Sequence, residues 1–178
     1  QNENYYTLQT VWNNETATND NVYYFWVRNK ETIGSKNKNI ITIDGPSASG
    51  KGSLTKALAS ELNFILLDSG LLYRAYSYCF DLTHDHKGAK ELFEKLSIEN
   101  ISHEMHVFDK ERNITSMLRH ENVAKSASKL SSLKETRLNL ISRQRDLAND
   151  VGLVADGRDM GTVVFPDAAT KFFLVADV

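Results

Sequence analysis

A glycine-rich turn between an apolar run and an amphipathic segment constrains this chain more than any other feature. The apolar run covers residues 40–43, the turn covers 45–53, and helically spaced apolar residues follow before a second apolar run at 64–67. Glycines at this spacing let the backbone curl until successive N–H groups form a nest for phosphate oxygens. The helix that starts near Lys51 adds its dipole, and Lys51 adds a mobile charge. The order strand, loop, helix, strand predicts a βαβ unit that binds nucleotide phosphates.

The turn nearly matches the phosphate-loop pattern G-x-x-x-x-G-K-[ST]. Gly52 takes the place of the hydroxyl residue, and Ser53 follows one position later. A plain Gly/Ser-rich turn is the alternative, but the strand before it and the helix after it favour phosphate binding. Because the hydroxyl is displaced, we expect Mg²⁺ to be held by nucleotide and water, with no direct protein ligand and with Ser53 and Asp156 as candidate contacts. The expected phosphate-binding residues are Gly45, Pro46, Ser47, Ala48, Ser49, Gly50, Lys51, Gly52 and Ser53.

Length and composition set the class of protein. With 178 residues, 41% hydrophobic and 25% charged, the chain has room for one α/β domain and a small appendage. A formal net charge of −2 disfavours nucleic acid and anionic membranes as partners. The single cysteine, Cys79, cannot form an internal disulfide, which favours a reducing compartment. Since no segment resembles a membrane span or a signal peptide, we expect a cytoplasmic protein, and we expect a monomer.

Residues 1–38 differ in composition from the rest of the chain. They contain both tryptophans and two aromatic runs, 5–12 and 22–26, on either side of a polar stretch at 13–21. β-prone runs around a turn-rich centre predict a β-hairpin. Stacking of nucleic acid on the aromatic residues is the alternative, but few positive charges accompany them. We therefore expect an N-terminal extension of unknown role, followed by a core domain at 39–178.

The second expected strand, residues 64–67, ends in polar residues. Asp68-Ser69-Gly70 follows it directly, and a helix expected at 71–80 carries Arg74 near its start. In open parallel sheets, ligands bind at the carboxyl ends of the strands. A lone arginine is usually a surface residue, but at this position Arg74 is a candidate for binding a second phosphate.

The third expected strand, residues 151–155, ends in Asp156-Gly157-Arg158-Asp159. Beside a phosphate loop, the carboxylate of Asp156 is a candidate for holding a magnesium-bound water or the acceptor. A crossover at 161–170 then leads to a fourth strand at 171–176.

Residues 81–120 are expected to form a small insertion. A polar loop with His84 and His86, a short helix at 89–96 and weak alternation over 100–118 predict a strand-bearing unit. An H-x-H pair can bind metal, but no further ligand cluster accompanies it, so a surface loop is expected. The other histidines are expected to be exposed: His103, His106 and His120.

Residues 121–149 predict two helices broken around Ser131 and Ser132. Most arginines of the second helix are expected on its solvent face. Its core stripe is expected to be Leu133, Leu140, Ile141 and Leu147.

Together these segments resemble one family, the bacterial cytidylate kinases within the nucleoside monophosphate kinases. The matching motifs are ITIDGPS at 41–47, GKGS at 50–53, DSG at 68–70 followed by Tyr73-Arg74, and ADGRDMGTVVFPDA at 155–168. The resemblance covers about residues 39–177. It implies an α/β fold in which helices flank the parallel sheet of a phosphate-loop kinase and an acceptor-binding insertion covers about 81–120.

The same resemblance implies ATP-dependent phosphorylation of CMP and dCMP to CDP and dCDP, with Mg²⁺. The loop around Lys51 would hold the ATP phosphates. Lys51 and Arg158 would be the catalytic residues, because positioning and charge neutralisation dominate phosphoryl transfer.

The resemblance also implies an acceptor site. Arg74 and Arg158 would bind the acceptor phosphate, with Ser69 nearby. Cytosine presents an amino donor beside two acceptors, so a carboxylate and Arg or Ser donors suit its edge. By similarity, the residues that read this edge are Ser128, Arg137 and Asp159.

The family's chain continues past the fourth strand into an arginine-rich lid, another strand and a terminal helix. This sequence starts at Gln1 rather than Met and stops at Val178 after an apolar run, so we expect a fragment truncated after the fourth strand. Residues 171–176 would then form an unpaired edge. Because a lid completes charge neutralisation and excludes water, a catalytically weak nucleotide-binding module is one alternative function. Another phosphate-loop kinase of shikimate type is a further alternative, and mutation of the base-reading residues distinguishes it.

Overall fold

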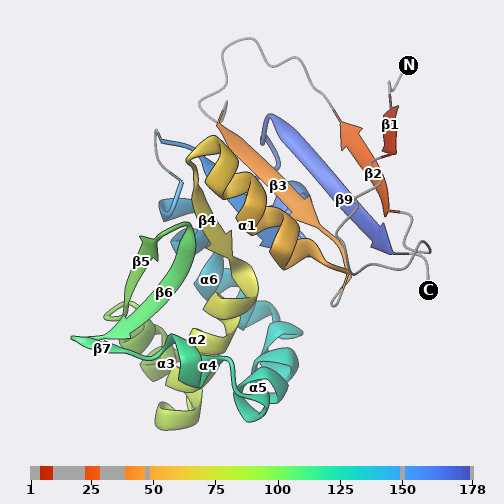
Figure 1. The fold of residues 1–178 in the computed structure, drawn as a ribbon. Helices are drawn as coiled ribbons and strands as arrows, with labels where there is room; N and C mark the ends of the chain where they lie inside the picture. Colours follow the sequence, from red (N-terminus) through yellow and green to blue (C-terminus); the bar gives the residue numbers. More distant parts are fainter. Residues whose placement is uncertain (1–4, 10–22, 29–38, 47–48, 149–150, 177–178) are drawn as a thin grey trace.

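The computed structural model describes residues 5–9, 23–28, 39–46, 49–148 and 151–176. Its main sheet has the strand order β1-β2-β9-β3-β8-β4 (Figure 1). The last four strands of this order run parallel, which confirms the expected α/β fold. They are β9 (Thr170–Ala176), β3 (Ile40–Asp44), β8 (Leu153–Gly157) and β4 (Ile65–Asp68).

Alternation along these strands divides the core between the two faces of the sheet. In β8, Val154 packs with a cluster under α1 (Lys51–Leu62), whereas Leu153 and Ala155 belong to a larger cluster. That larger cluster includes side chains of α2 (Ser69–Thr83) and α6 (Lys134–Asp146). Both faces of the parallel sheet are therefore covered, as such sheets require.

The α1 helix follows the phosphate loop as expected, but only some of its helically spaced apolar residues are buried. Thr55 and Ala59, four residues apart, are buried, whereas Ala57 is exposed and Leu62 is 40% exposed. The phase of a helix that starts at Lys51 turns 55 and 59 toward the sheet.

The third strand also begins later than expected, at Leu153. Gly152 has a φ of +121°, and a Cβ there would lie 2.5 Å from the ring of Phe64. This tight crossing favours glycine and delays the strand. The strand also ends later than expected: it pairs with β3 as far as Asp44 and Gly157, so Asp156 and Gly157 lie within β8.

The insertion contains α3 (His86–Phe93), a three-stranded antiparallel sheet and the short α4 (Thr115–Leu118). The strands are β5 (Ser97–Ile101), β6 (Glu104–Asp109) and β7 (Arg112–Asn113). The α3 helix starts before the expected residue 89 because the Asp85 carboxylate accepts a hydrogen bond from the Gly88 amide. The expectation of a plain surface loop was wrong for His86, whose Nδ1 lies 3.0 Å from the Tyr76 hydroxyl.

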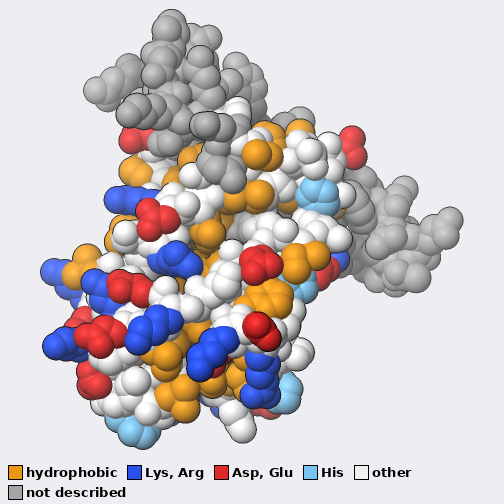
Figure 2. Space-filling model, turned by 90° about the vertical axis from the view of Figure 1, so that its left-hand side faces the viewer, with side chains coloured by type: hydrophobic (Ala, Val, Ile, Leu, Met, Phe, Trp, Pro, Cys, Tyr) orange, Lys and Arg blue, Asp and Glu red, His pale blue; other side chains and the backbone are white. Residues whose placement is uncertain are grey.

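Side chains attach this insertion to the free edge of β4. The Asn100 amide accepts from Leu66 N at 2.8 Å and donates to Leu66 O at 3.0 Å, as a neighbouring strand would. His103, expected to be exposed, is half-buried, with Nδ1 3.2 Å from Phe64 O. An ion pair joins Lys56 of α1 to Glu104 of β6. Figure 2 shows acidic and basic side chains interspersed on this side of the molecule, which is typical of a solvated surface.

The two predicted helices of 121–149 are confirmed as α5 (Glu121–Ser131) and α6, with the break at Ser132 and Leu133. The expected core stripe was wrong in part: Leu133 is 44% exposed, while Thr136 and Gln144 are buried. Two arginines of α6 donate to backbone carbonyls of neighbouring segments rather than only facing solvent: Arg143 to Leu96, and Arg145 to Val163 and Val164.

The expectation of an unpaired edge at 171–176 was wrong. β2 (Tyr23–Arg28) pairs antiparallel with β9, and β1 (Tyr5–Gln9) pairs with β2. Strand pairing between segments so distant in sequence cannot be read from local pattern. The division into an extension and a core domain stays a prediction. Among the described residues, the helices are too short or too polar to cross a membrane.

Candidate functional site

The phosphate loop turns tightly at the carboxyl end of β3. Gly45 has a φ of +152°, and a Cβ there would lie 2.4 Å from Leu174 O, so a side chain would clash with β9. Gly50, at φ 80°, precedes α1 and directs the first amides of the helix toward the loop. The Ser49 hydroxyl and Lys51 Nζ both donate to Pro46 O, at 2.9 and 2.7 Å. Ser47 and Ala48 lie outside the described residues.

A cavity of about 540 Å³ lies beside this loop, and we refer to it as the loop cavity. Four loop residues line it: Gly50, Lys51, Gly52 and Ser53. Facing the loop are the ends of β4 and β8, the start of α2 and one residue of the insertion: Asp68, Gly70, Leu71, Arg74, Arg119 and Asp156.

A second cavity, of about 390 Å³, lies at the carboxyl ends of β4 and β8, and we refer to it as the strand-end cavity. It brings together every residue expected at the acceptor site: Ser69, Arg74, Ser128, Arg137, Arg158 and Asp159. Both cavities share five residues, so they adjoin: Lys51, Asp68, Gly70, Arg74 and Asp156. Volumes of this size suit small-molecule ligands.

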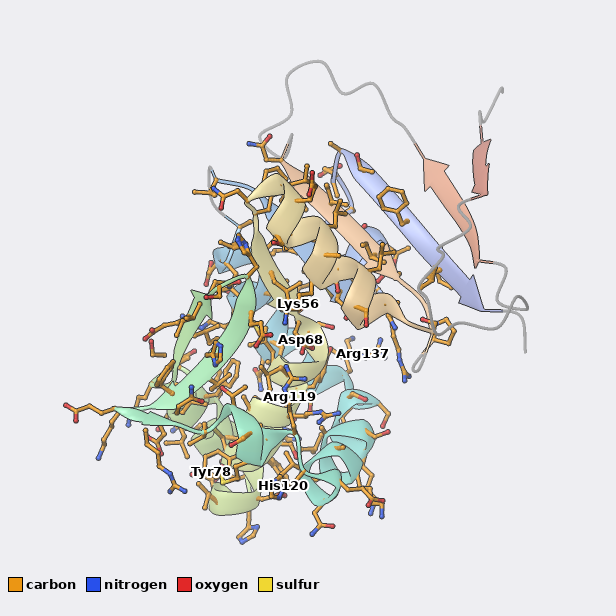
Figure 3. The ribbon with its side chains drawn as sticks, in the orientation of Figure 1. Lys56, Asp68, Tyr78, Arg119, His120 and Arg137 are labelled. Atoms are coloured by element: carbon orange, nitrogen blue, oxygen red, sulfur yellow. The ribbon has the colours of Figure 1, made fainter. Side chains whose placement is uncertain are left out.

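Arg137 and Asp159 form an ion pair in the strand-end cavity, with 3.7 Å between Nη1 and Oδ2. The Arg137 Nε also donates to Ser131 O at 2.8 Å, so the guanidinium is held from two sides. Figure 3 shows Arg137 on the same side of the sheet end as Asp68. The cavity therefore offers an oriented guanidinium, which donates hydrogen bonds, beside a carboxylate, which accepts them.

Asp44 fixes the turn that carries Arg158 and Asp159, a role that was not predicted from the sequence. This carboxylate is 5% exposed, and its two oxygens each accept a backbone N–H at 2.8 Å, from Met160 and Gly161. Those amides belong to η1 (Met160–Val164), a π-helical turn. Burial raises the pKa of Asp44, while the two amide hydrogen bonds oppose that change. Asp44 thus ties the acceptor-side turn to the strand that precedes the phosphate loop.

Asp156 lies between the two cavities and close to Lys51. Burial raises the pKa of Asp156 from 3.8 to about 6; the charge of Lys51 opposes the change, and Asp68 and Asp44 add to it. Ser53 and Asp156 line the same cavity. No group of three or more metal-ligating side chains occurs among the residues the structure describes. Hydroxyl and carboxylate oxygens, as on Ser53 and Asp156, are of the kind that contact Mg²⁺ directly or through water.

Two further cavity residues were given no role at the site by the sequence. Tyr73 lines the strand-end cavity, and burial raises the pKa of its hydroxyl. Arg119 lines the loop cavity from the insertion. Tyr73 stands in a motif that carries the family resemblance, but the motif gave it no role; Arg119 stands in no such motif, and only the folded chain brings it to the sheet end. Cys79 is buried away from both cavities, and burial raises its pKa to about 12, so its thiol is inert.

Comparison with known proteins gives one family. The sequence profile described as cytidylate kinase matches residues 41–178. A cytidylate kinase of Haemophilus ducreyi is 44% identical over 149 residues, which cover 79% of this chain and 65% of that protein. A cytidylate kinase of Pasteurella multocida is 40% identical over 151 residues, covering 79% of this chain and 64% of the relative. Cytidylate kinase 2 of Haemophilus influenzae is 44% identical over 144 residues, which cover 77% of this chain and 64% of that protein. The chain therefore spans slightly less than two thirds of the length of these relatives.

Proposed function

Because this chain belongs to the cytidylate kinase family, we propose that it transfers the γ-phosphoryl group of ATP to CMP and dCMP, giving CDP and dCDP. The observation that carries the proposal is the strand-end cavity, in which Ser128, Arg137 and Asp159 lie beside a phosphate loop. An oriented carboxylate and guanidinium complement the amino group and the acceptors of cytosine.

In this proposal the loop cavity binds the donor. Backbone amides at the start of α1 and Lys51 Nζ hold the β- and γ-phosphates. Lys51 reaches both cavities, so its charge can follow the phosphoryl group from donor to acceptor. Backbone contacts are indifferent to the nucleobase, so the loop cavity contributes affinity for phosphates rather than base selection.

The strand-end cavity binds the acceptor nucleotide. Arg74 and Arg158 hold its phosphate near Lys51, with Ser69 beside them. An acceptor phosphate oxygen is the nucleophile and is already anionic, so it needs little help from a general base. Catalysis then rests on alignment of donor and acceptor and on neutralisation of the transferred charge by Lys51 and Arg158.

Ser53 and Asp156 are the residues suited to hold Mg²⁺ through water beside the donor phosphates. When bound, the ion supplies additional charge neutralisation on the phosphate oxygens. Asp156 serves this role in its ionised form, which predominates above pH about 6.

The test is a turnover assay of the full chain with ATP and Mg²⁺ and with CMP, dCMP, UMP, AMP or shikimate as acceptor. With CMP or dCMP as acceptor, the proposal predicts one ADP for each CDP or dCDP formed. With shikimate as acceptor, it predicts no phosphorylated product. Formation of ADP at the same rate without an acceptor, or preferential phosphorylation of AMP or shikimate, would contradict it.

A further inference from the structure

Arg119 is a cation of the loop cavity to which the proposed function gives no role. It immediately follows α4 of the insertion and faces four residues of the phosphate loop across the cavity. Three cations and two carboxylates line this cavity: Lys51, Arg74 and Arg119, against Asp68 and Asp156. Arg119 is the one contributed by the insertion.

The backbone at Arg119 is firmly placed. The preceding residue, Leu118, is fully buried, and the Thr115 hydroxyl accepts a 2.9 Å hydrogen bond from Val107 N. Arg74 Nη1 lies 3.5 Å from Leu118 O, so a cation of α2 contacts the carbonyl just before Arg119. The side chain of Arg119 therefore extends toward the loop from a fixed base.

The present partner of Arg119 holds it weakly. Its Nη2 lies 3.4 Å from Asp68 Oδ2, and the two side chains are 56% and 25% exposed (Figure 3). The other oxygen of Asp68 caps α2 by accepting from Leu71 N at 2.9 Å. Exposed ion pairs of this kind contribute little in water, so an anion with several charges can displace the contact at small cost.

We propose that Arg119 binds the phosphate groups of the nucleoside triphosphate donor. The inference rests on the proposed function and adds a donor-binding residue from the insertion. A guanidinium can make two parallel hydrogen bonds to phosphate oxygens, and the loop cavity presents it opposite the amides of Gly50 to Ser53. We assign Arg119 to the donor nucleotide rather than to the acceptor nucleotide, because Arg119 does not line the strand-end cavity. Bound donor would thereby connect the phosphate loop to the insertion.

The test is calorimetric titration of the full chain with ATP and, separately, with CMP. Arg119→Ala should weaken ATP binding about tenfold, as expected for loss of a charged hydrogen bond, and should change CMP binding less than twofold. Arg119→Lys should recover part of the affinity for ATP, since lysine keeps the positive charge but cannot make the two parallel hydrogen bonds of a guanidinium. Arg112→Ala is the matched control, because Arg112 is an exposed arginine of the same insertion that lines neither cavity.

Asp68→Asn separates ligand binding from a purely structural ion pair. Asparagine preserves the cap of α2 and removes the charge that pairs with Arg119. The proposal predicts that this variant binds ATP at least as tightly as the parent chain. If Asp68→Asn and Arg119→Ala weaken ATP and CMP binding equally, Arg119 only holds the insertion in place and the inference is overturned.

The inference and the proposed function fail in different ways. Turnover of CMP by the parent chain, with ATP affinity unchanged in Arg119→Ala, overturns the inference alone. Absence of ATP and CMP binding in the parent chain overturns both.

Discussion

The loop cavity and the strand-end cavity share Lys51 and Asp156 but are built in different ways. One contiguous segment, Gly50 to Ser53 at the start of α1, provides the loop side of the loop cavity. Side chains from α2, α5, α6 and the end of β8 provide the strand-end cavity. A backbone nest can bind any polyphosphate, whereas the proposed function requires the converging side chains to select one base edge. Substitutions should therefore separate general phosphate handling from base selection.

Lys51→Met should have the largest effect, because Lys51 belongs to both cavities. We expect kcat to fall about 10²–10³-fold, the magnitude typical of removing one preorganised charge donor. The measurement is steady-state turnover of ATP with CMP. Lys56→Met is the matched control on the same helix, since Lys56 pairs with Glu104 and lines neither cavity. Equal losses in both variants would show that the effect does not come from the cavities.

Asp159→Asn should come next and should act on one cavity only. The substitution removes the carboxylate proposed to accept from cytosine, and it also removes the ion-pair partner of Arg137. CMP affinity should therefore fall about 10–100-fold, while ATP affinity changes little. Separate titrations with the two nucleotides measure this. Asp167→Asn, an exposed carboxylate farther along the same segment, should leave both affinities unchanged. A parallel loss of ATP affinity would erase the distinction between the cavities.

Asp156→Asn should change how the stability of the protein depends on pH, at a residue that lines both cavities. The pKa of Asp156 is higher in the folded protein, about 6, than its ordinary value of 3.8, so the folded state binds this proton more tightly than the unfolded chain does. Ionisation of Asp156 therefore lowers the free energy of unfolding. This cost is absent below pH 4 and reaches its full value, on the order of 3 kcal/mol, above pH about 6. Asparagine removes this cost, so the variant should unfold at a higher temperature than the parent at pH 8 and at a similar temperature below pH 4.

The same substitution should reduce turnover, because the ionised carboxylate is the form suited to hold Mg²⁺. In the parent chain, kcat should rise as the pH passes through about 6. In the variant, this rise in kcat should be absent. Thermal unfolding and kcat measured across pH 4–8 test both effects. A difference in unfolding temperature between the two proteins that does not change with pH would contradict the raised pKa of Asp156.

Asp44→Asn should have the smallest effect, through the turn rather than through a ligand. Asparagine offers one acceptor oxygen where two amides now donate, and relief of a buried charge offsets part of the loss. We expect about 1 kcal/mol of destabilisation by chemical denaturation and a few-fold higher KM for CMP, with the KM for ATP nearly unchanged. A rise confined to the KM for ATP would mean that Asp44 supports the phosphate loop instead.

The two cavities also differ in how far the sequence predicts them. The phosphate loop is local, so the glycines, Lys51 and the flanking strand and helix predicted its place between β3 and α1. Its phosphate-binding chemistry stays a prediction. Ser128, Arg137 and Asp159 could be placed only by resemblance, because nothing in their spacing shows that α5, α6 and β8 meet. Asp44 and Arg119 were missed for the same reason: their partners lie 116 and 51 residues away in sequence.

The fold shows the same limit. The parallel sheet and the break between α5 and α6 follow from hydrophobic runs and their spacing. Pairing of β9 with β2 and docking of Asn100 on the edge of β4 depend on contacts between distant segments. Sequence periodicity could not reveal them.

The measurement that tests the two-cavity account most directly is calorimetric titration of the parent chain and Asp159→Asn with CMP, UMP and AMP. The account predicts that the parent chain prefers CMP over UMP and AMP, and that the variant loses this preference while still binding ATP. Equal binding of the three monophosphates by the parent chain, or an unchanged preference in the variant, would contradict base reading in the strand-end cavity.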